Sequence, residues 1–285
     1  MSGDVSVRVT RVPAEFEKIV FGFLQQDPVL NTVLLGNVHD RAARPMLGEN
    51  EPPVLVSVHD PAGQVIGAAM RTAGRGIHLG GLDASLAPEV AATYAAICPD
   101  APQVSGTADA ARAFAGTWST LTGKAYAEGR GTRLHRLDVL AEPPAPSGSA
   151  RRAVEGELDL CARWAGAFED EVALSVGADE VRLGWARTQV QRGLLWLWED
   201  AGEVVSMASL REPIFGASRI GPVYTPDERR GRGYASALTA VVSRVIVDAG
   251  SLACLYTDLA NPTSNKIYAA LGYRPVADFV DYVFT

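Results

Sequence analysis

A glycine-rich turn near residue 231 is the part of the sequence best suited to chemistry. It reads Arg230-Gly231-Arg232-Gly233-Tyr234-Ala235-Ser236 and follows a predicted strand over 219–225. Apolar residues at helical spacing come next: Ala235, Leu238, Val242, Val245 and Ala249. Glycine lets the backbone approach a ligand closely, and the free N–H groups and dipole of a helix N-terminus favour an anion. We therefore expect an anion-binding loop between this strand and this helix.

Two common nucleotide-binding loops do not fit this turn. The sequence has no G-x-x-x-x-G-K-[ST] run, which disfavours a P-loop. Ser236 stands where a dinucleotide-binding fingerprint would have its third glycine. Two further G-x-G pairs, Gly74/Gly76 and Gly129/Gly131, precede alternating stretches and are interpreted as hairpin turns.

A second motif lies downstream of the turn. Asn261-Pro262-Thr263-Ser264-Asn265-Lys266-Ile267-Tyr268 is followed by Leu271-Gly272-Tyr273. The turn matches the R/Q-x-x-G-x-G/A signature of the GCN5-related N-acetyltransferases, and the second motif is similar to their N-x-x-[AS]-x-x-[LI]-Y-x-x-x-G-[FY]. The chain therefore resembles this family over residues 193–285, whereas its first half resembles the family only in the predicted order of elements.

The resemblance implies acetyl-CoA as cosubstrate and no metal. The diphosphate would lie on the backbone N–H groups of residues 231–236, and the pantetheine arm would pair with the strand at 223–225 where two strands separate. Gly221-Pro222 would mark the bulge that opens this separation. Basic side chains, including Arg229, could offset the phosphate charge. The residues expected at the cosubstrate are Val223, Tyr224, Thr225, Arg230, Gly231, Arg232, Gly233, Tyr234, Ala235, Ser236, Asn261, Ser264, Lys266 and Tyr268.

Acyl transfer needs an oxyanion donor, a proton for the thiolate and a base for the nucleophile. The resemblance assigns the donor to a backbone N–H near Val223 or Tyr224, and the general acid to Tyr268. No carboxylate lies on 219–225, which leaves Glu212, Asp258 or a water relay as the base. Each of these residues also has a purely structural interpretation. Tyr268 would pack as an aromatic side chain on a helix face, and Asn261 would cap a helix. Asp258 would be a turn residue and Glu212 a surface charge.

The predicted first helices of the second half carry an acidic group that would attract a cationic amine. Solvated charges that begin helices are the competing interpretation, and core packing competes with substrate stacking for the two tryptophans of one strand. The acidic residues are Glu169, Asp170, Glu171, Asp179 and Glu180, and the tryptophans are Trp196 and Trp198.

The chain of 285 residues divides near its middle. Residues 141–150 contain three prolines with small residues, which predicts an exposed, semi-stiff linker between a domain over 1–140 and one over 151–285. We predict an α+β (mixed α/β) fold of two tandem acetyltransferase-like domains, each a mixed, largely antiparallel twisted sheet flanked by helices. No glycine signature follows Leu82-Asp83. When the two halves of the sequence are aligned, Ser119 takes the position of Tyr268. The first domain is therefore expected to be degenerate and to lack the CoA motif.

The composition of the chain excludes some kinds of binding partner. A net charge of −7 disfavours binding to nucleic acid through a broad basic surface, and no stretch is apolar enough to cross a membrane. Cys98, Cys161 and Cys254 form no C-x-x-C pair, and the four histidines have no metal-ligand spacing. A reducing cytoplasm is the expected location.

Two functions remain open, with a third less favoured. The first is direct transfer of an acetyl group to a small-molecule amine, without a covalent enzyme intermediate, and Tyr268 favours it. The second is a non-catalytic acyl-CoA-binding or sensor module, which the missing strand carboxylate favours. The third is a protein N-acetyltransferase whose first half docks a peptide. The oligomeric state is not predicted.

Overall fold

The computed structural model describes residues 5–44, 51–172 and 178–285, which form two compact units. One unit comprises the chain up to Arg133 together with Ala277–Thr285, and the other comprises Leu134–Val276. These limits differ from the expected domains, because the division falls before the proline segment and the C-terminal residues belong with the first unit.

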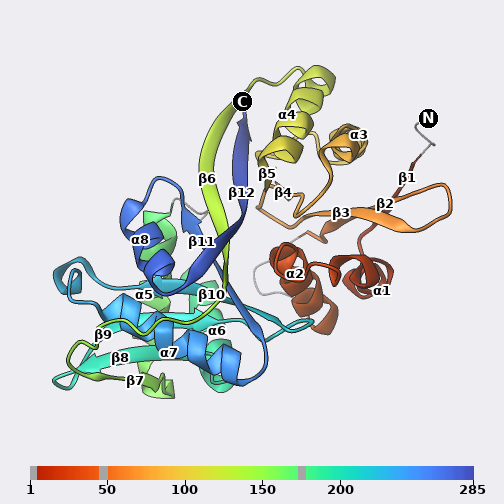
Figure 1. Ribbon diagram of the computed structural model, residues 1–285. Coiled ribbons are helices and arrows are strands. Elements are labelled where there is room, and N and C mark those ends of the chain that lie inside the picture. Colours follow the sequence, from red (N-terminus) through yellow and green to blue (C-terminus); the bar gives the residue numbers. More distant parts are fainter. Residues whose placement is uncertain (1–4, 45–50, 173–177) are drawn as a thin grey trace. The chain divides into compact units, whose positions relative to one another are not determined.

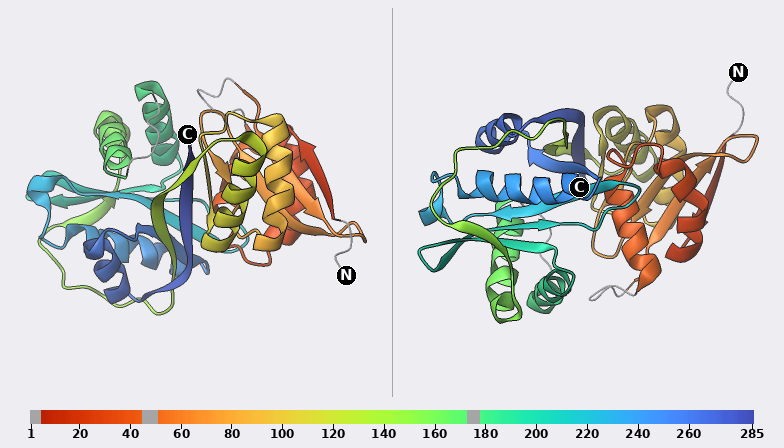
Figure 2. Two further views of the ribbon diagram at one scale, coloured as in Figure 1. Left: turned by 90° about the horizontal axis from the view of Figure 1, so that it is seen from above. Right: turned by 60° about the horizontal axis from the view of Figure 1, so that its bottom comes forward.

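In the first unit, five strands pair with the C-terminal strand in the order β1-β2-β3-β4-β5-β12. The described pairs are antiparallel except β4 with β5. Helices α1 and α2 pack together, as do α3 and α4 (Figures 1 and 2). The elements are β1 (Ser6–Thr10), α1 (Pro13–Leu24), α2 (Thr32–Ala43), β2 (Val54–His59), β3 (Val65–Arg71), β4 (Ile77–His78), a 3-10 turn (Ala84–Leu86), α3 (Ala87–Ile97), β5 (Gln103–Thr107), α4 (Ala108–Thr122) and β6 (Tyr126–Leu137).

In the second unit the strand order is β6-β11-β10-β9-β8-β7. Again the described pairs include one parallel pair, β10 with β11. The elements are β7 (Ser149–Arg152), a 3-10 turn (Glu155–Glu157), α5 (Leu158–Glu171), α6 (Asp179–Gln191), β8 (Leu195–Asp200), β9 (Glu203–Leu210), β10 (Ala217–Tyr224), a 3-10 turn (Asp227–Arg229), α7 (Tyr234–Asp248), β11 (Leu252–Asp258), α8 (Pro262–Ala270) and β12 (Tyr273–Phe284).

The two element series repeat one another. Apart from the 3-10 turns, each runs strand, two helices, three strands, helix, strand, helix, strand. The parallel pair occupies the same place in both series. The predicted fold class, two tandem mixed and largely antiparallel sheets flanked by helices, is confirmed.

Two separate hydrophobic cores pack against the sheet of the second unit. Leu238, Val242 and Ile246 of α7 belong to one, whereas Cys161 of α5 and Ala186 of α6 belong to the other. Helices α5 and α6 therefore cover one face of the sheet and α7 covers the opposite face, as Figure 2 shows. Trp196 and Trp198 pack against the α7 core, which favours the packing interpretation of both side chains.

The proline segment is largely exposed, as its composition predicts, but tertiary contacts hold it at both ends. Trp198 Nε1 donates to the Ser147 carbonyl at 2.8 Å, and the Ala141 N–H donates to the Leu271 carbonyl at 3.1 Å. Arg244 of α7 forms an ion pair with Glu142. Ser149 and Ala150, expected at the end of the linker, begin β7. Tertiary contacts thus hold the segment within the second unit at both ends.

Among the described residues, no helix is long and apolar enough to cross a membrane. The same residues contain no group of three or more His, Cys, Asp or Glu side chains placed to hold a metal ion.

Candidate functional site

Strands β10 and β11 separate partway along their length. Their described pairing runs from Ala217↔Leu252 to Ile220↔Leu255 and goes no further. Beyond Ile220, β10 stays paired with β9 through Val223↔Ala208 and Tyr224↔Met207, after a register shift that includes Gly221-Pro222. The bulge therefore lies where the sequence predicts it, and it leaves one side of residues 221–224 without a described neighbouring strand.

The glycine turn lies between β10 and α7. Gly231 and Gly233 have φ of +77° and +85°, a left-handed backbone that glycine adopts without steric cost. Gly233 is the N-cap of α7. A Cβ at Gly231 would meet no atom within 4 Å, so the space beside the turn is open.

The backbone donors of this turn are available. The Arg230 N–H bonds to Asp227 and the Ala237 N–H bonds to Gly233. In the described part of the chain, no hydrogen bond uses the N–H groups between them, those of residues 231–236. The carbonyls nearby do not consume these donors, so the turn retains the capacity for an anion that the sequence predicts. These residues fit a diphosphate.

The arginines of the turn have unequal surroundings. Arg229 pairs with Glu203. Arg230 pairs with Glu171 and Asp227, and its Nε donates to the Thr225 carbonyl at 2.8 Å. Arg232 makes one long hydrogen bond, 3.5 Å from its Nη2 to the Glu228 carbonyl. The hydrogen bond from the Tyr234 hydroxyl lowers the pKa of the Asp200 carboxyl, and the charge of Arg232 helps to lower it. Arg232 is therefore the guanidinium of this turn most available to a phosphate, whereas Arg230 fastens the turn to the residue that follows β10.

The other residues expected at the cosubstrate also differ in how many of their polar groups have partners. Thr225 is buried, its hydroxyl lies 2.8 Å from Ser206 Oγ, and its carbonyl accepts from Arg230. The Tyr224 carbonyl accepts from Ser206 Oγ at 3.1 Å. The Tyr234 hydroxyl donates to Asp200, whereas its backbone N–H has no described partner. Lys266 is exposed on α8.

Tyr268 lies on α8 against the core beneath α7. Its ring meets that of Tyr273 edge to face, with centroids 6.0 Å apart. Burial raises the pKa of Tyr268 to about 12. The phenol consequently stays protonated throughout the neutral range, which suits a proton donor.

Asn261 performs the capping role that competed with cosubstrate binding. Its Oδ1 accepts from the Thr263 and Ser264 N–H groups at 3.1 Å each, at the start of α8. Capping occupies one side-chain oxygen and places Pro262 at the first helical turn. The Ser264 hydroxyl donates to the Asn261 carbonyl and reinforces the same turn.

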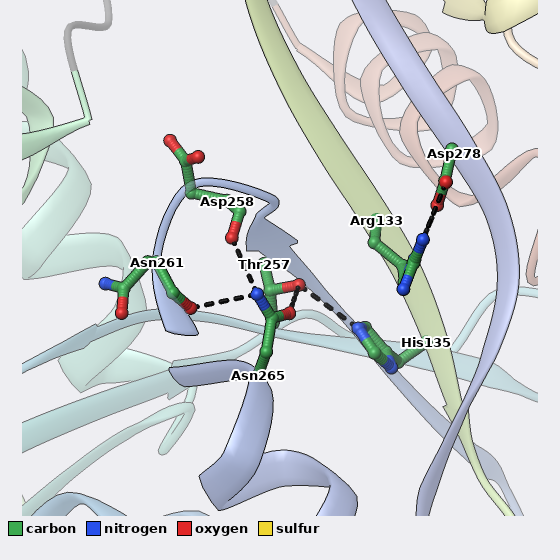
Figure 3. A network of polar contacts seen from close by, with 7 residues as sticks. All are labelled: Arg133, His135, Thr257, Asp258, Asn261, Asn265 and Asp278. Atoms are coloured by element: carbon green, nitrogen blue, oxygen red, sulfur yellow. Dashed lines mark hydrogen bonds and ion pairs between the residues drawn. The ribbon is translucent and has the colours of Figure 1, made fainter. Parts of the chain in front are cut away.

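A partly buried network that sequence reasoning missed fastens α8 to β11 (Figure 3). Asn265 Nδ2 donates to the Asp258 and Asn261 carbonyls at 3.0 and 2.9 Å. Its Oδ1 accepts from Thr257 Oγ1 at 2.6 Å. Since this bond uses the Thr257 proton, His135 Nε2, 3.1 Å from the same oxygen, must be the donor to it. Asn265 lies inside the second motif, but nothing local in the sequence shows its long-range partner His135.

Figure 3 also shows an ion pair further along β6. Arg133 Nε and Nη2 lie 2.6 and 2.8 Å from the two carboxylate oxygens of Asp278, a two-point contact. Both residues belong to the first unit.

The candidate bases have structural partners. Glu212 is half exposed and pairs with Arg192 at 2.8 Å. Asp258 Oδ1 accepts from the Ala260 N–H at 2.8 Å, as a turn residue does. No described contact joins either carboxylate to Tyr268 or to the glycine turn, and the water relay stays a prediction.

Much of the expected acceptor charge is neutralised. Glu169 and Asp179 both pair with Arg182, at 3.1 Å each, and Glu171 pairs with Arg230. Asp170 and Glu180 have no basic partner among the described contacts. Residues 173–177, which lie between α5 and α6, are outside the described part of the chain.

The matching turn of the first unit, between β4 and α3, has a different character. Asp83 Oδ1 accepts from the Ser85 N–H at 2.8 Å and from its hydroxyl at 2.6 Å. These bonds lower the pKa of Asp83, which keeps the carboxylate charged. The 3-10 turn Ala84–Leu86 runs directly into α3, so this unit has no glycine turn at the place of residues 231–233. A Cβ at Gly81, before the 3-10 turn, would lie 2.5 Å from Leu30 Cδ2.

Comparisons with known proteins agree with this geometry. A family model described as FR47-like protein matches residues 201–280, which contain both motifs. No curated protein matches the chain. Solved structures with a similar fold include a GNAT-family acetyltransferase from Colwellia psychrerythraea, with 9% identity, TM-score 0.65 and coverage of 98% of this chain and 100% of that one.

Two further structures extend the likeness. A GCN5-related N-acetyltransferase from Sphaerobacter thermophilus has 17% identity and TM-score 0.62, over 98% of this chain and 94% of that one. A tandem GNAT protein from the clavulanic acid biosynthesis pathway has 14% identity and TM-score 0.56, over 98% of each chain. At these identities the likeness is one of fold, and it covers nearly the whole chain.

Proposed function

Since this chain has the motifs and the fold of the GCN5-related N-acetyltransferase superfamily, we propose that it transfers an acetyl group from acetyl-CoA to an amine. The observation that carries the proposal is the turn at residues 231–236, whose backbone N–H groups have no described partner beside an open space. An anion fits such a turn at the start of α7. The separation of β10 from β11 supports an extended arm beside residues 221–224.

When bound, acetyl-CoA supplies an activated thioester. The amides of 231–236 hold and orient it, and Arg232 offsets its phosphate charge. A backbone N–H near Val223 or Tyr224 stabilises the oxyanion that forms when the neutral amine attacks the thioester carbonyl. A water relay takes the proton that the amine nitrogen loses, since Glu212 and Asp258 both have structural partners. Tyr268 keeps its proton until the thiolate leaves and then donates it there.

We further propose that one unit does this work. In the first unit, the Asp83 carboxylate accepts from the Ser85 N–H at the turn, and Glu89 adds a second negative charge in the first turn of α3. Both charges oppose a diphosphate. The acceptor we propose is a small cationic amine, to which Asp170 and Glu180 remain available.

The rival function is a non-catalytic acyl-CoA sensor. It is favoured by one observation, that Glu212 and Asp258 both have structural partners. The two functions share the turn and differ in turnover.

Gly231→Asp and Gly231→Asn test the turn. Asp and Asn have similar shapes and both tolerate a left-handed backbone, but only Asp sets a negative charge among the N–H donors. We expect calorimetry to show acetyl-CoA binding weakened about tenfold more by Asp than by Asn, since the difference is one unfavourable charge contact. Gly250→Asp, at φ +75° with equally open space, is the matched control and should bind normally.

Equal binding by the Asp and Asn variants would refute the assignment of the turn. Release of free thiol from acetyl-CoA with a panel of amines separates the two functions. Binding without thiol release from any amine would favour the sensor.

A further inference from the structure

A hollow of about 310 Å³ adjoins the turn in the second unit. Pro143, Pro144, Ala145 and Pro146 line one part of it. Arg232, Gly233 and Ser236 line the rest. Its volume lies at the lower end of the range for ligand pockets, about 300–1,000 Å³. The hollow shares residues with the proposed diphosphate turn, so a ligand lying on that turn would have its next chemical group within reach of the prolines.

The proline wall is held in place. Glu142 pairs with Arg244 on one side of it, and the Ser147 carbonyl accepts from Trp198 Nε1 on the other. Proline fixes its own φ, and three such residues in four positions leave little backbone freedom between these attachments. The wall is therefore formed before a ligand arrives, which reduces the entropy lost on binding.

The chemistry of the lining is mixed in a specific way. Proline rings offer apolar faces and carry no N–H donor, which suits the flat face of a base. Arg232 offers a guanidinium that is exposed and in no described ion pair, with Asp200 as its acidic neighbour, which suits a phosphate. Ser236 adds a hydroxyl and a backbone N–H from the first turn of α7. An apolar face beside a cation fits a phosphorylated adenosine.

We propose that residues 143–146 form one wall of the subsite for the adenosine 3′-phosphate end of CoA. The inference rests on the proposed function, because the turn must first hold the diphosphate. The segment that joins the two halves of the sequence thereby becomes part of the coenzyme site.

Calorimetry with CoA and with 4′-phosphopantetheine, which lacks the adenosine, tests this wall. Ala145→Asp sets a carboxylate in the lining, and Ala145→Asn is its neutral match at an exposed position. We expect the Asp variant to bind CoA about tenfold more weakly than the Asn variant, since it sets like charge beside the phosphates. Both variants should bind 4′-phosphopantetheine as the unaltered chain does.

A Pro144→Ala/Pro146→Ala variant tests the apolar contact. We expect weaker CoA binding with unchanged 4′-phosphopantetheine binding, and Pro213→Ala, in an exposed loop, serves as the control for loss of a proline. If both sets of variants bind CoA like the unaltered chain, the wall plays no part and the inference is wrong while the turn stands. If the unaltered chain binds no CoA, the proposed function itself fails.

Discussion

Arg229, Arg230 and Arg232 flank one turn but have different partners. The first two form ion pairs with Glu203, Glu171 and Asp227, whereas no described ion pair includes Arg232, whose charge acts on the Asp200 carboxylate without such a contact. An arginine already paired has less attraction left for a phosphate. The electrostatic contribution of the turn is therefore concentrated in one side chain, although the whole chain has a net charge of −7.

Arg232→Gln should weaken acetyl-CoA binding and reduce its dependence on salt, because salt screens this exposed cation. Calorimetry over a series of ionic strengths measures both effects. Arg229→Gln removes an equal charge from a paired side chain and should change the affinity less. A larger loss of affinity from Arg229→Gln would show that the ion pairs of these arginines do not determine which of them contacts the phosphates.

Tyr268→Phe removes the proposed acid and keeps the ring. We expect kcat to fall about 100-fold or more, the usual range for a lost general acid, with acetyl-CoA affinity nearly unchanged. Because folding raises the pKa of Tyr268 from 10.0 to about 12, deprotonation of this phenol should not lower kcat below pH 10. Steady-state thiol release against pH, with the best amine found, checks both points.

Tyr273→Phe is the matched control. Its ring contacts that of Tyr268, and its hydroxyl lies 2.7 Å from Ser243 Oγ. Loss of this bond should cost about 1 kcal/mol of stability and leave kcat in place. Equal kcat for all three proteins would remove Tyr268 from the chemistry.

The sequence predicts residues of this site where local backbone dictates the residue type. Gly231 and Gly233 have the positive φ that their motif implies, and Gly221-Pro222 lies at the bulge. It does not predict His135 or the partners of Arg230, because those contacts join segments far apart in the chain. Asn261 lies between these two cases, because the Asn-Pro pair alone predicts its role as a helix cap.

At the scale of elements, two attachments fix the site. Arg230 ties the turn to the residue that follows β10, through the Thr225 carbonyl, and Asn265 ties α8 to the end of β11. The position of Tyr268 therefore depends on the partly buried network of His135, Thr257 and Asn265 as well as on helix packing.

Thr257→Val tests that network with little change in shape. It removes the hydroxyl that accepts from His135 and donates to Asn265, and Thr257 is buried. We expect the free energy of unfolding to fall by about 1–3 kcal/mol in denaturant titrations, the usual cost of unsatisfied buried polar groups. Thr257→Ser keeps the hydroxyl and should lose less. Equal losses would mean that packing of the methyl group, and not the network, holds α8.

At the scale of the whole molecule, the compact units have other limits than the domains that composition predicts. Prolines at 143–146 suggest a linker, yet contacts from Trp198 and Arg244 hold that segment within the second unit. The C-terminal strand instead pairs with β5 through Phe279↔Thr107 to Val283↔Gln103. Pairing across so many residues leaves no local signal, so only the three-dimensional structure reveals that the first unit contains the end of the chain.

Phe284→Ala should therefore destabilise the first unit although it changes the penultimate residue. Phe284 stacks on Trp118 with centroids 5.0 Å apart and belongs to the first unit's core. Truncation of a buried phenylalanine costs about 3–5 kcal/mol, which is a large share of the free energy of unfolding of a typical domain. Hydrogen exchange should show faster exchange in peptides from residues 51–133, with less change in those from residues 195–258. Val247→Ala, an exposed position on α7, is the control. Loss of protection confined to the second unit would instead mean that residues 277–285 stabilise the half of the sequence from which they come.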